Sequence, residues 1–145
     1  GLTIRDNVEG TRIIQLTPYV WHLMNALPRR GDYVFASASK PTQPIAKPHT
    51  AQATACQVAG IDHLTFHGLR RSFKSLTEWL EVPAGVVAQI MGHKPSATAE
   101  KHYTVRPLDL LRQHHERIEA WVLEQAGVQF DAQAEPGKLR MVAGA

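Results

Sequence analysis

The segment from residue 65 to residue 81 limits the possible folds more than any other stretch, because its apolar residues recur at helical spacing. In TFHGLRRSFKSLTEWLE the steps between them are 3, 4, 3 and 4, and the residues are Phe66, Leu69, Phe73, Leu76 and Leu80. Side chains at these steps lie on one face of an α-helix, so the pattern predicts an amphipathic helix with an apolar stripe. Thr65 precedes the stripe and is a candidate N-cap.

Prolines and glycines divide much of the remaining chain into further helices. Proline suits the first position of a helix and glycine its end, because proline has no backbone N–H and glycine readily adopts the left-handed conformation. The predicted helices begin at Pro18, with Thr17 as its cap, and at His49, Pro83 and Pro107, and the last three end near Gly60, Gly92 and Gly127. Ser96 or Thr98 is a candidate cap for one more short helix, which runs through Tyr103.

The chain opens with a predicted β-hairpin. Leu2–Arg5 and Thr11–Leu16 have strand-like composition and lie on either side of the turn-like segment DNVEG. Residues 28–48 are expected to be loop with a short strand at Tyr33–Phe35, because three prolines in KPTQPIAKP exclude a regular helix. The predicted fold is mainly α with a small β-hairpin at the N-terminal side, an α+β class. Because the chain starts directly in a predicted strand, we expect it to be part of a longer protein.

Cysteine and hydropathy exclude two classes of protein. The one cysteine, Cys56, excludes a disulfide framework within the chain and fits a reducing cytosol. No apolar run approaches the length of a transmembrane helix, so we expect no membrane partner.

The spacing of some histidines suggests a metal site, but the residues around them argue against one. His63 and His67 are four residues apart, as in zinc proteases, but Leu64 stands where those enzymes need a glutamate as general base. His114 and His115 are adjacent and point in different directions on a helix, which favours surface residues over ligands. The sequence therefore predicts no metal.

Basic residues concentrate in the middle of the chain. From His63 to Arg106 there are six lysines and arginines against three glutamates, while from Pro107 onward acidic residues prevail. A local basic face suggests a polyanionic partner such as nucleic acid. An ordinary solvated surface is the alternative that charge alone leaves open.

His67 and Arg70 are the first candidates for chemistry. They are three positions apart on the predicted helix and therefore neighbours on its surface. A guanidinium offers two parallel donors to the non-bridging oxygens of a phosphate, and an imidazole donates a hydrogen bond or moves a proton. Arg71 and Lys74 extend this basic flank. On these residues alone, an unspecialised basic helix face is the alternative.

A longer motif extends the pattern. HGLRR is followed by IMGHKPSATAEKHYT, which places Gly92 before His93 and Tyr103 ten residues after it. The order His-x-x-Arg, Gly-His and Tyr, with the flanking LRRSF and KHYT, resembles the catalytic domain of the tyrosine recombinases, also called the phage integrase family. The resemblance runs from Leu2 to about Leu123, and it implies the fold of the DNA breaking-rejoining enzymes.

The resemblance also implies roles for these residues. Tyr103 is the expected nucleophile toward a DNA phosphate, His67 the expected acceptor of its proton, and Arg70 and His93 the expected donors to the non-bridging oxygens. Further phosphate contacts are expected from Arg71, Lys74, Lys94 and Lys101. The implied reaction needs neither ATP nor a metal, so no cofactor is expected. The implied partners are double-stranded attachment sites and other recombinase protomers, as a tetramer on DNA, in the cytoplasm of a bacterium at its nucleoid.

Two parts of the family pattern are missing from these residues. The family has another arginine about twenty residues before the hairpin, and the sequence begins after that point. It also has a lysine in the hairpin turn, a general acid toward the leaving oxygen; Asn7 stands there, and no lysine precedes Lys40. Either the alignment is off by a residue or two, or this is a weakened recombinase. A decayed relative that only binds DNA is the second hypothesis.

The expected domain division follows from these boundaries. Residues 1–126 are expected to be part of a recombinase catalytic domain, and we expect these 145 residues alone to be inactive. Residues 127–145 form a polar tail with Gly and Pro, which is expected to be either flexible or an arm that docks on a partner.

Overall fold

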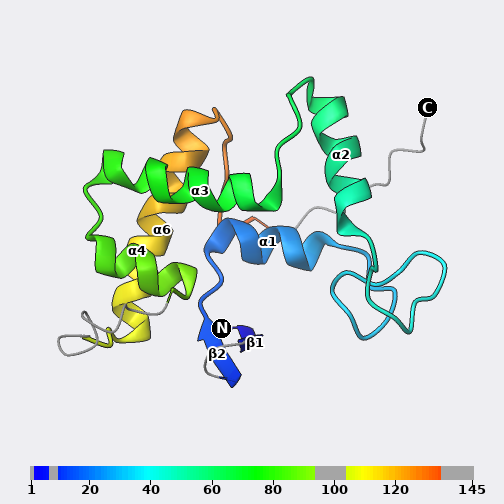
Figure 1. Cartoon of the computed structure of the whole chain (residues 1–145), viewed down its shortest axis with the longest axis horizontal. Helices are drawn as coiled ribbons and strands as arrows, with labels where there is room; N and C mark the ends of the chain where they lie inside the picture. The colour runs from blue at the N-terminus through cyan, green and yellow to red at the C-terminus, as the bar shows by residue number, and fades with distance from the viewer. Residues whose placement is uncertain (1, 7–9, 94–103, 135–145) are drawn as a thin grey trace. The chain divides into compact units, whose positions relative to one another are not determined.

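The computed structural model describes residues 2–6, 10–93 and 104–134 (Figure 1). The chain divides into two compact units. Unit 1 comprises Gly1–Trp21 and Ser72–Gln133, and unit 2 comprises His22–Arg71 and Ala134–Ala145. The described elements are mainly helices with one two-stranded sheet, which confirms the predicted fold class.

The sheet in unit 1 is the predicted hairpin. Strand β1 (Leu2–Asp6) pairs antiparallel with β2 (Gly10–Ile14), and the register sets Leu2 opposite Ile14 and Asp6 opposite Gly10. On β2, Ile13 is 51% exposed while Arg12 is partly buried. The strand therefore directs a charged side chain inward and an apolar one outward, which its hydrophobicity pattern does not predict.

The hydrophobic core of unit 1 lies between α4 (Ala84–Met91) and α6 (Leu108–Gln125), which pack together (Figure 1). Its buried residues are Val82, Val86, Val87, Met91 and Ile118. Val86 and Val87 of α4 are 2% and 5% exposed. Pro83 precedes α4 and Pro107 precedes α6, as the sequence predicts for helix starts.

Helix α3 (Phe66–Leu76) begins at the predicted cap. The Thr65 hydroxyl oxygen accepts a hydrogen bond from the Gly68 N–H at 2.9 Å, which satisfies one of the backbone donors that a helix start leaves without a partner. The helix ends earlier than its stripe, and Thr77–Leu80 continue as a 3₁₀ turn, η1. There the Thr77 hydroxyl donates to the Lys74 carbonyl at 2.7 Å.

Only part of the apolar stripe of α3 and η1 packs against the hydrophobic core. Phe73 and Leu80 pack against the core of unit 1. Phe66 and Leu69, at the start of the stripe, are 46% and 47% exposed. The period of the stripe predicted the helix correctly, but periodicity cannot say how many turns another element covers.

Helix α1 (Pro18–Ala26) starts at the predicted proline and is fastened to α6. The Glu119 carboxylate accepts hydrogen bonds from the backbone N–H groups of Tyr19 (3.0 Å) and Val20 (3.2 Å). A carboxylate is favoured there because the N-terminus of a helix carries partial positive charge. Thr17 is buried, and its backbone carbonyl accepts from the Trp21 N–H.

The chain after α6 returns to α1. Gly127 has a φ of 64°, and the Phe130 ring packs edge-on against Tyr19 with 5.1 Å between ring centroids. The first part of the predicted tail therefore lies against unit 1. Residues 135–145 lie outside the described residues, and their role as an arm stays a prediction.

Unit 2 contains α2 (Pro48–Ala59) and the loop before it. Gly60 ends α2 in the left-handed conformation with a φ of 65°, as predicted. Between residues 28 and 47, Ala36 and Pro44 form an isolated bridge, and Tyr33–Phe35 are bend and turn instead of the expected strand. The His49 ring lies 5.3 Å from Phe66, and Gln52 hydrogen-bonds the Leu64 carbonyl, so α2 supports the start of α3.

Candidate nucleic-acid interface and catalytic residues

Helix α3 carries four of the residues named from the sequence. His67, Arg70, Arg71 and Lys74 are all exposed on this helix. His67 and Arg70, three positions apart, are neighbours on its surface, as predicted. The Thr65 cap and the contact of Phe66 with His49 stabilise the start of α3. His67 and Arg70 lie in this stabilised part of the helix.

His93 follows directly after the end of α4. Gly92 takes the left-handed conformation (φ 67°) and its N–H donates to the Gln89 carbonyl at 3.0 Å, while the His93 N–H donates to the Ala88 carbonyl at 2.8 Å. These two hydrogen bonds satisfy carbonyls at the helix end and turn the chain sharply. His93 is exposed immediately after that turn.

Arg12, on strand β2 of the hairpin, contacts Gly92 at this turn. Its guanidinium group occupies the space where a Cβ atom at position 92 would lie. The sequence placed Arg12 on the hairpin and gave it no role. No local signal predicts the contact, because Arg12 and Gly92 belong to elements far apart in the chain.

Gln89 is a second residue that sequence reasoning missed. Its side-chain Nε2 donates to the Thr104 carbonyl at 2.6 Å, and its Oε1 accepts from the Arg106 N–H at 3.1 Å. Thr104 is the first residue after Tyr103. One side-chain amide on α4 therefore holds the backbone on the C-terminal side of the predicted nucleophile.

Four residues of the predicted site lie outside the described residues. They are Asn7, Lys94, Lys101 and Tyr103. Their roles stay predictions. The same holds for the short helix expected through Tyr103.

His115 takes part in the packing of α6 against α3. Its ring packs edge-on against Phe73, with 6.1 Å between centroids, and it is half-buried on α6. Burial lowers the pKa of His115 below its ordinary value, and the nearby carboxylates of Glu119 and Glu116 oppose this shift only in part. The reason is packing: α3 covers this face of α6.

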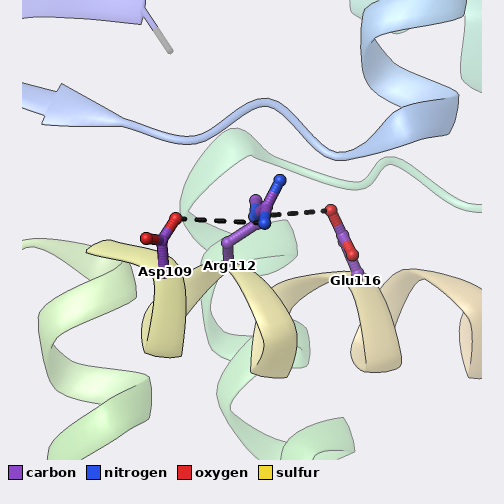
Figure 2. A network of polar contacts seen from close by, with 3 residues as sticks. All are labelled: Asp109, Arg112 and Glu116. Carbon is purple, nitrogen blue, oxygen red and sulfur yellow. Dashed lines mark ion pairs between the residues drawn. The ribbon is translucent and has the colours of Figure 1, made fainter. Parts of the chain in front are cut away.

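Charges on α6 are arranged differently from those on α3. Arg112 lies between Asp109 and Glu116, with 3.9 Å between the charged atoms of each pair (Figure 2). All three side chains are substantially exposed, so these ion pairs contribute little to stability. They do balance the charge of Arg112 locally, whereas the α3 segment with Arg70, Arg71 and Lys74 contains no acidic residue.

Neither a metal site nor a membrane-spanning helix is found in the described part of the chain. Among these residues, no group of three or more His, Cys, Asp or Glu side chains could hold a metal ion. No helix there has the length and hydropathy needed to cross a bilayer.

Comparison with known proteins agrees with the motif. The model of the phage integrase family matches residues 7–107. The prophage integrase IntF of Escherichia coli (strain K12) is 53% identical over 88% of this chain, and the chain spans 29% of the length of that relative. No solved structure matches. On the evidence of the family match and of this identity, the chain belongs to the phage integrase family.

Proposed function

We propose that this chain is the catalytic part of a site-specific tyrosine recombinase, with Tyr103 as nucleophile and His67, Arg70 and His93 around the scissile phosphate. The observation that carries the proposal is the pairing of exposed His67 and Arg70 on one supported helix, in a chain of the phage integrase family. Arg71, Lys74, Lys94 and Lys101 are proposed to contact neighbouring phosphates of double-stranded DNA. Residues 1–126 belong to the catalytic domain in this proposal.

The proposed reaction is a pair of transesterifications. The Tyr103 hydroxyl attacks phosphorus, its proton passes to His67, and the bond to the 5′-oxygen breaks, which leaves a 3′-phosphotyrosyl link and a 5′-hydroxyl. A tyrosine hydroxyl has an ordinary pKa of about 10, so it needs such an acceptor near neutral pH. Arg70 and His93 donate to the non-bridging oxygens, where negative charge grows in the transition state.

The second step reverses the first with another strand. A 5′-hydroxyl from the partner duplex attacks the phosphotyrosyl link, the bond between phosphorus and the tyrosine oxygen breaks, and the hydroxyl of Tyr103 is restored. The number of phosphodiester bonds is unchanged, so the reaction requires no ATP. In this proposal Arg70 and His93 stabilise the transition-state charge, so no metal is invoked. Two duplexes supply the four strands that such an exchange needs, and a tetramer of protomers supplies one Tyr103 for each strand.

Asn7 sets a limit on this activity. The leaving 5′-oxygen needs a proton, and an asparagine at the position of the family's turn lysine cannot supply one. The arginine that the family carries before the hairpin is also not among these 145 residues. Losing one transition-state donor costs on the order of 10²–10³ in rate, so we propose that these 145 residues by themselves do not cleave DNA measurably.

Asn7 also favours a second candidate function. In this alternative the protein is a decayed integrase that binds DNA through the basic face of α3 without cutting it. The intact set of His67, Arg70, His93 and Tyr103 supports the enzyme instead.

A covalent-trapping experiment separates the two candidates. A nicked duplex that loses the strand beyond the cleavage site prevents religation, so the full-length protein should accumulate a covalent protein–DNA complex that denaturing gels detect. Tyr103→Phe should abolish this complex, because phenylalanine has no hydroxyl. Tyr33→Phe is the matched control, since Tyr33 is an exposed tyrosine in the loop after α1, and it should leave the complex intact.

The outcomes are distinct. A complex that persists in Tyr103→Phe would show that another residue is the nucleophile. A wild-type protein that binds DNA without any covalent complex would favour the decayed relative.

A further inference from the structure

The two ends of the segment that carries Lys94 to Tyr103 are both fastened to one residue of α4. On the N-terminal side, the Gln89 backbone carbonyl accepts the N–H of Gly92, the residue before His93. On the C-terminal side, the Gln89 side chain holds Thr104 and Arg106. His93 and Thr104, the residue after Tyr103, are therefore both hydrogen-bonded to the last turns of one short helix, α4.

The side-chain amide of Gln89 is used on both of its atoms. Nε2 donates to the Thr104 carbonyl at 2.6 Å, and Oε1 accepts from the Arg106 N–H at 3.1 Å. The donor and the acceptor of this one amide group match the carbonyl of Thr104 and the N–H of Arg106, two residues further along the chain. Glutamate, which keeps the acceptor and loses the donor, cannot replace both bonds.

Arg106 adds a second fastening to α4. Its guanidinium nitrogens lie 3.0 and 3.1 Å from where a Cβ atom on Gly85 would be, so it covers the start of the helix. The same guanidinium donates to the Thr104 carbonyl at 3.4 Å. The next residue is Pro107, after which α6 begins and packs on α4. The backbone from Thr104 onward is thus attached to α4 at several points.

We propose that Gln89 is a positioning residue for the nucleophile: it fixes the peptide that follows Tyr103 to the helix end that presents His93, and so sets the approach of the tyrosine hydroxyl to phosphorus. The inference rests on the proposed function of Tyr103. Gln89 itself touches neither DNA nor the reacting atoms in this proposal. Positional errors of about 1 Å cost up to about 10²-fold in rate. The hydrogen bonds of the Gln89 side chain to Thr104 and Arg106 are therefore sufficient to control the rate of cleavage.

The first test measures cleavage in the full-length protein. Gln89→Leu preserves side-chain size and helical preference but removes both hydrogen bonds. At saturating nicked duplex, the rate of covalent-complex formation should fall roughly 10- to 100-fold, while DNA affinity is unchanged. Gln113→Leu is the matched control, because Gln113 is an exposed glutamine on α6, and it should cleave at the wild-type rate.

The second test measures the hydrogen bonds without relying on activity. Amide hydrogen exchange at Arg106 should be faster in Gln89→Leu, since its N–H loses its acceptor, while the Leu111 amide, which donates to the Pro107 carbonyl, serves as an internal reference. Gln89→Glu separates the two bonds. It keeps the acceptor for Arg106 and places an oxygen against the Thr104 carbonyl, so Arg106 should stay protected while cleavage falls.

Three results would overturn the inference. Unchanged exchange at Arg106 in Gln89→Leu would mean that Gln89 does not hydrogen-bond the Arg106 N–H in solution. Faster exchange with a wild-type rate of cleavage would mean that these hydrogen bonds do not position the nucleophile. In that case the proposed function would stand if Tyr103→Phe still abolished the covalent complex. A complex that persists in Tyr103→Phe would overturn the proposed function together with this inference.

Discussion

Arg12 and Gly92 are in direct contact: the guanidinium group of the arginine lies where the first side-chain carbon of any other residue at position 92 would be. Gly92 also has a φ of 67°, a conformation that side chains with a Cβ atom rarely adopt. Two independent causes therefore require glycine at this position. One is local and belongs to the end of α4, and the other comes from the hairpin.

Gly92→Ala should separate these two causes when it is compared with Gly127→Ala. Gly127 has a similar φ of 64°, but nothing lies within 4 Å of the Cβ position there. We expect Gly127→Ala to lower the free energy of unfolding by about 1 kcal/mol, from backbone strain alone. Gly92→Ala should cost about 2–4 kcal/mol, because overpacking against Arg12 adds to that strain. Denaturant unfolding measures both values.

The double variant Arg12→Ala, Gly92→Ala provides the control. Removing the guanidinium should recover most of the extra cost, so the two substitutions should be strongly non-additive. Additive effects would show that the arginine does not press on position 92 in solution.

His115 predicts how stability depends on pH. Burial lowers its pKa in the folded protein below the ordinary value of about 6.5, so the unfolded chain binds a proton at a pH where the folded chain does not. The contribution is fully favourable above the unfolded pKa and is lost as pH falls through that value toward the folded pKa. His115→Leu should therefore show a smaller loss of stability on acidification below about pH 6.5.

Nuclear magnetic resonance titration of the His115 ring measures the same shift directly. The ring should titrate below the value of histidine in an unfolded peptide. A pKa at or above that value would mean that Glu116 and Glu119 outweigh the loss of solvent, and the predicted direction of the stability change would reverse.

Arg71 should bind DNA through phosphates and carry no sequence information. Arg71→Ala should weaken binding of the full-length protein equally on an attachment site and on unrelated DNA, and lower the slope of log affinity against log salt by roughly 0.9. Arg112→Ala is the matched control, because Asp109 and Glu116 already balance that charge, and its slope should equal that of the wild type. A loss of affinity confined to the attachment site would contradict a phosphate contact at Arg71.

Much of the local structure follows from the sequence alone. The start of α3 at the Thr65 cap, the starts after Pro83 and Pro107, and the glycine that ends α4 were all predicted, because capping and helical periodicity depend on residues within a few positions of each other. The family also follows from the sequence, since its motif is an order of residues along the chain, and the comparisons confirmed it.

Only the tertiary structure decided which distant side chains complete these elements. Glu119 fastens the start of α1 from a position 100 residues away, Arg12 closes on Gly92, and the amide of Gln89 meets the backbone after Tyr103. His115 is half-buried because Phe73 of another helix packs against its ring. In each case the partner is brought in by the packing of another element, and the hydrophobic effect that drives this packing is non-directional. Local sequence therefore determines where a helix begins and ends, whereas the fold determines what its polar side chains contact.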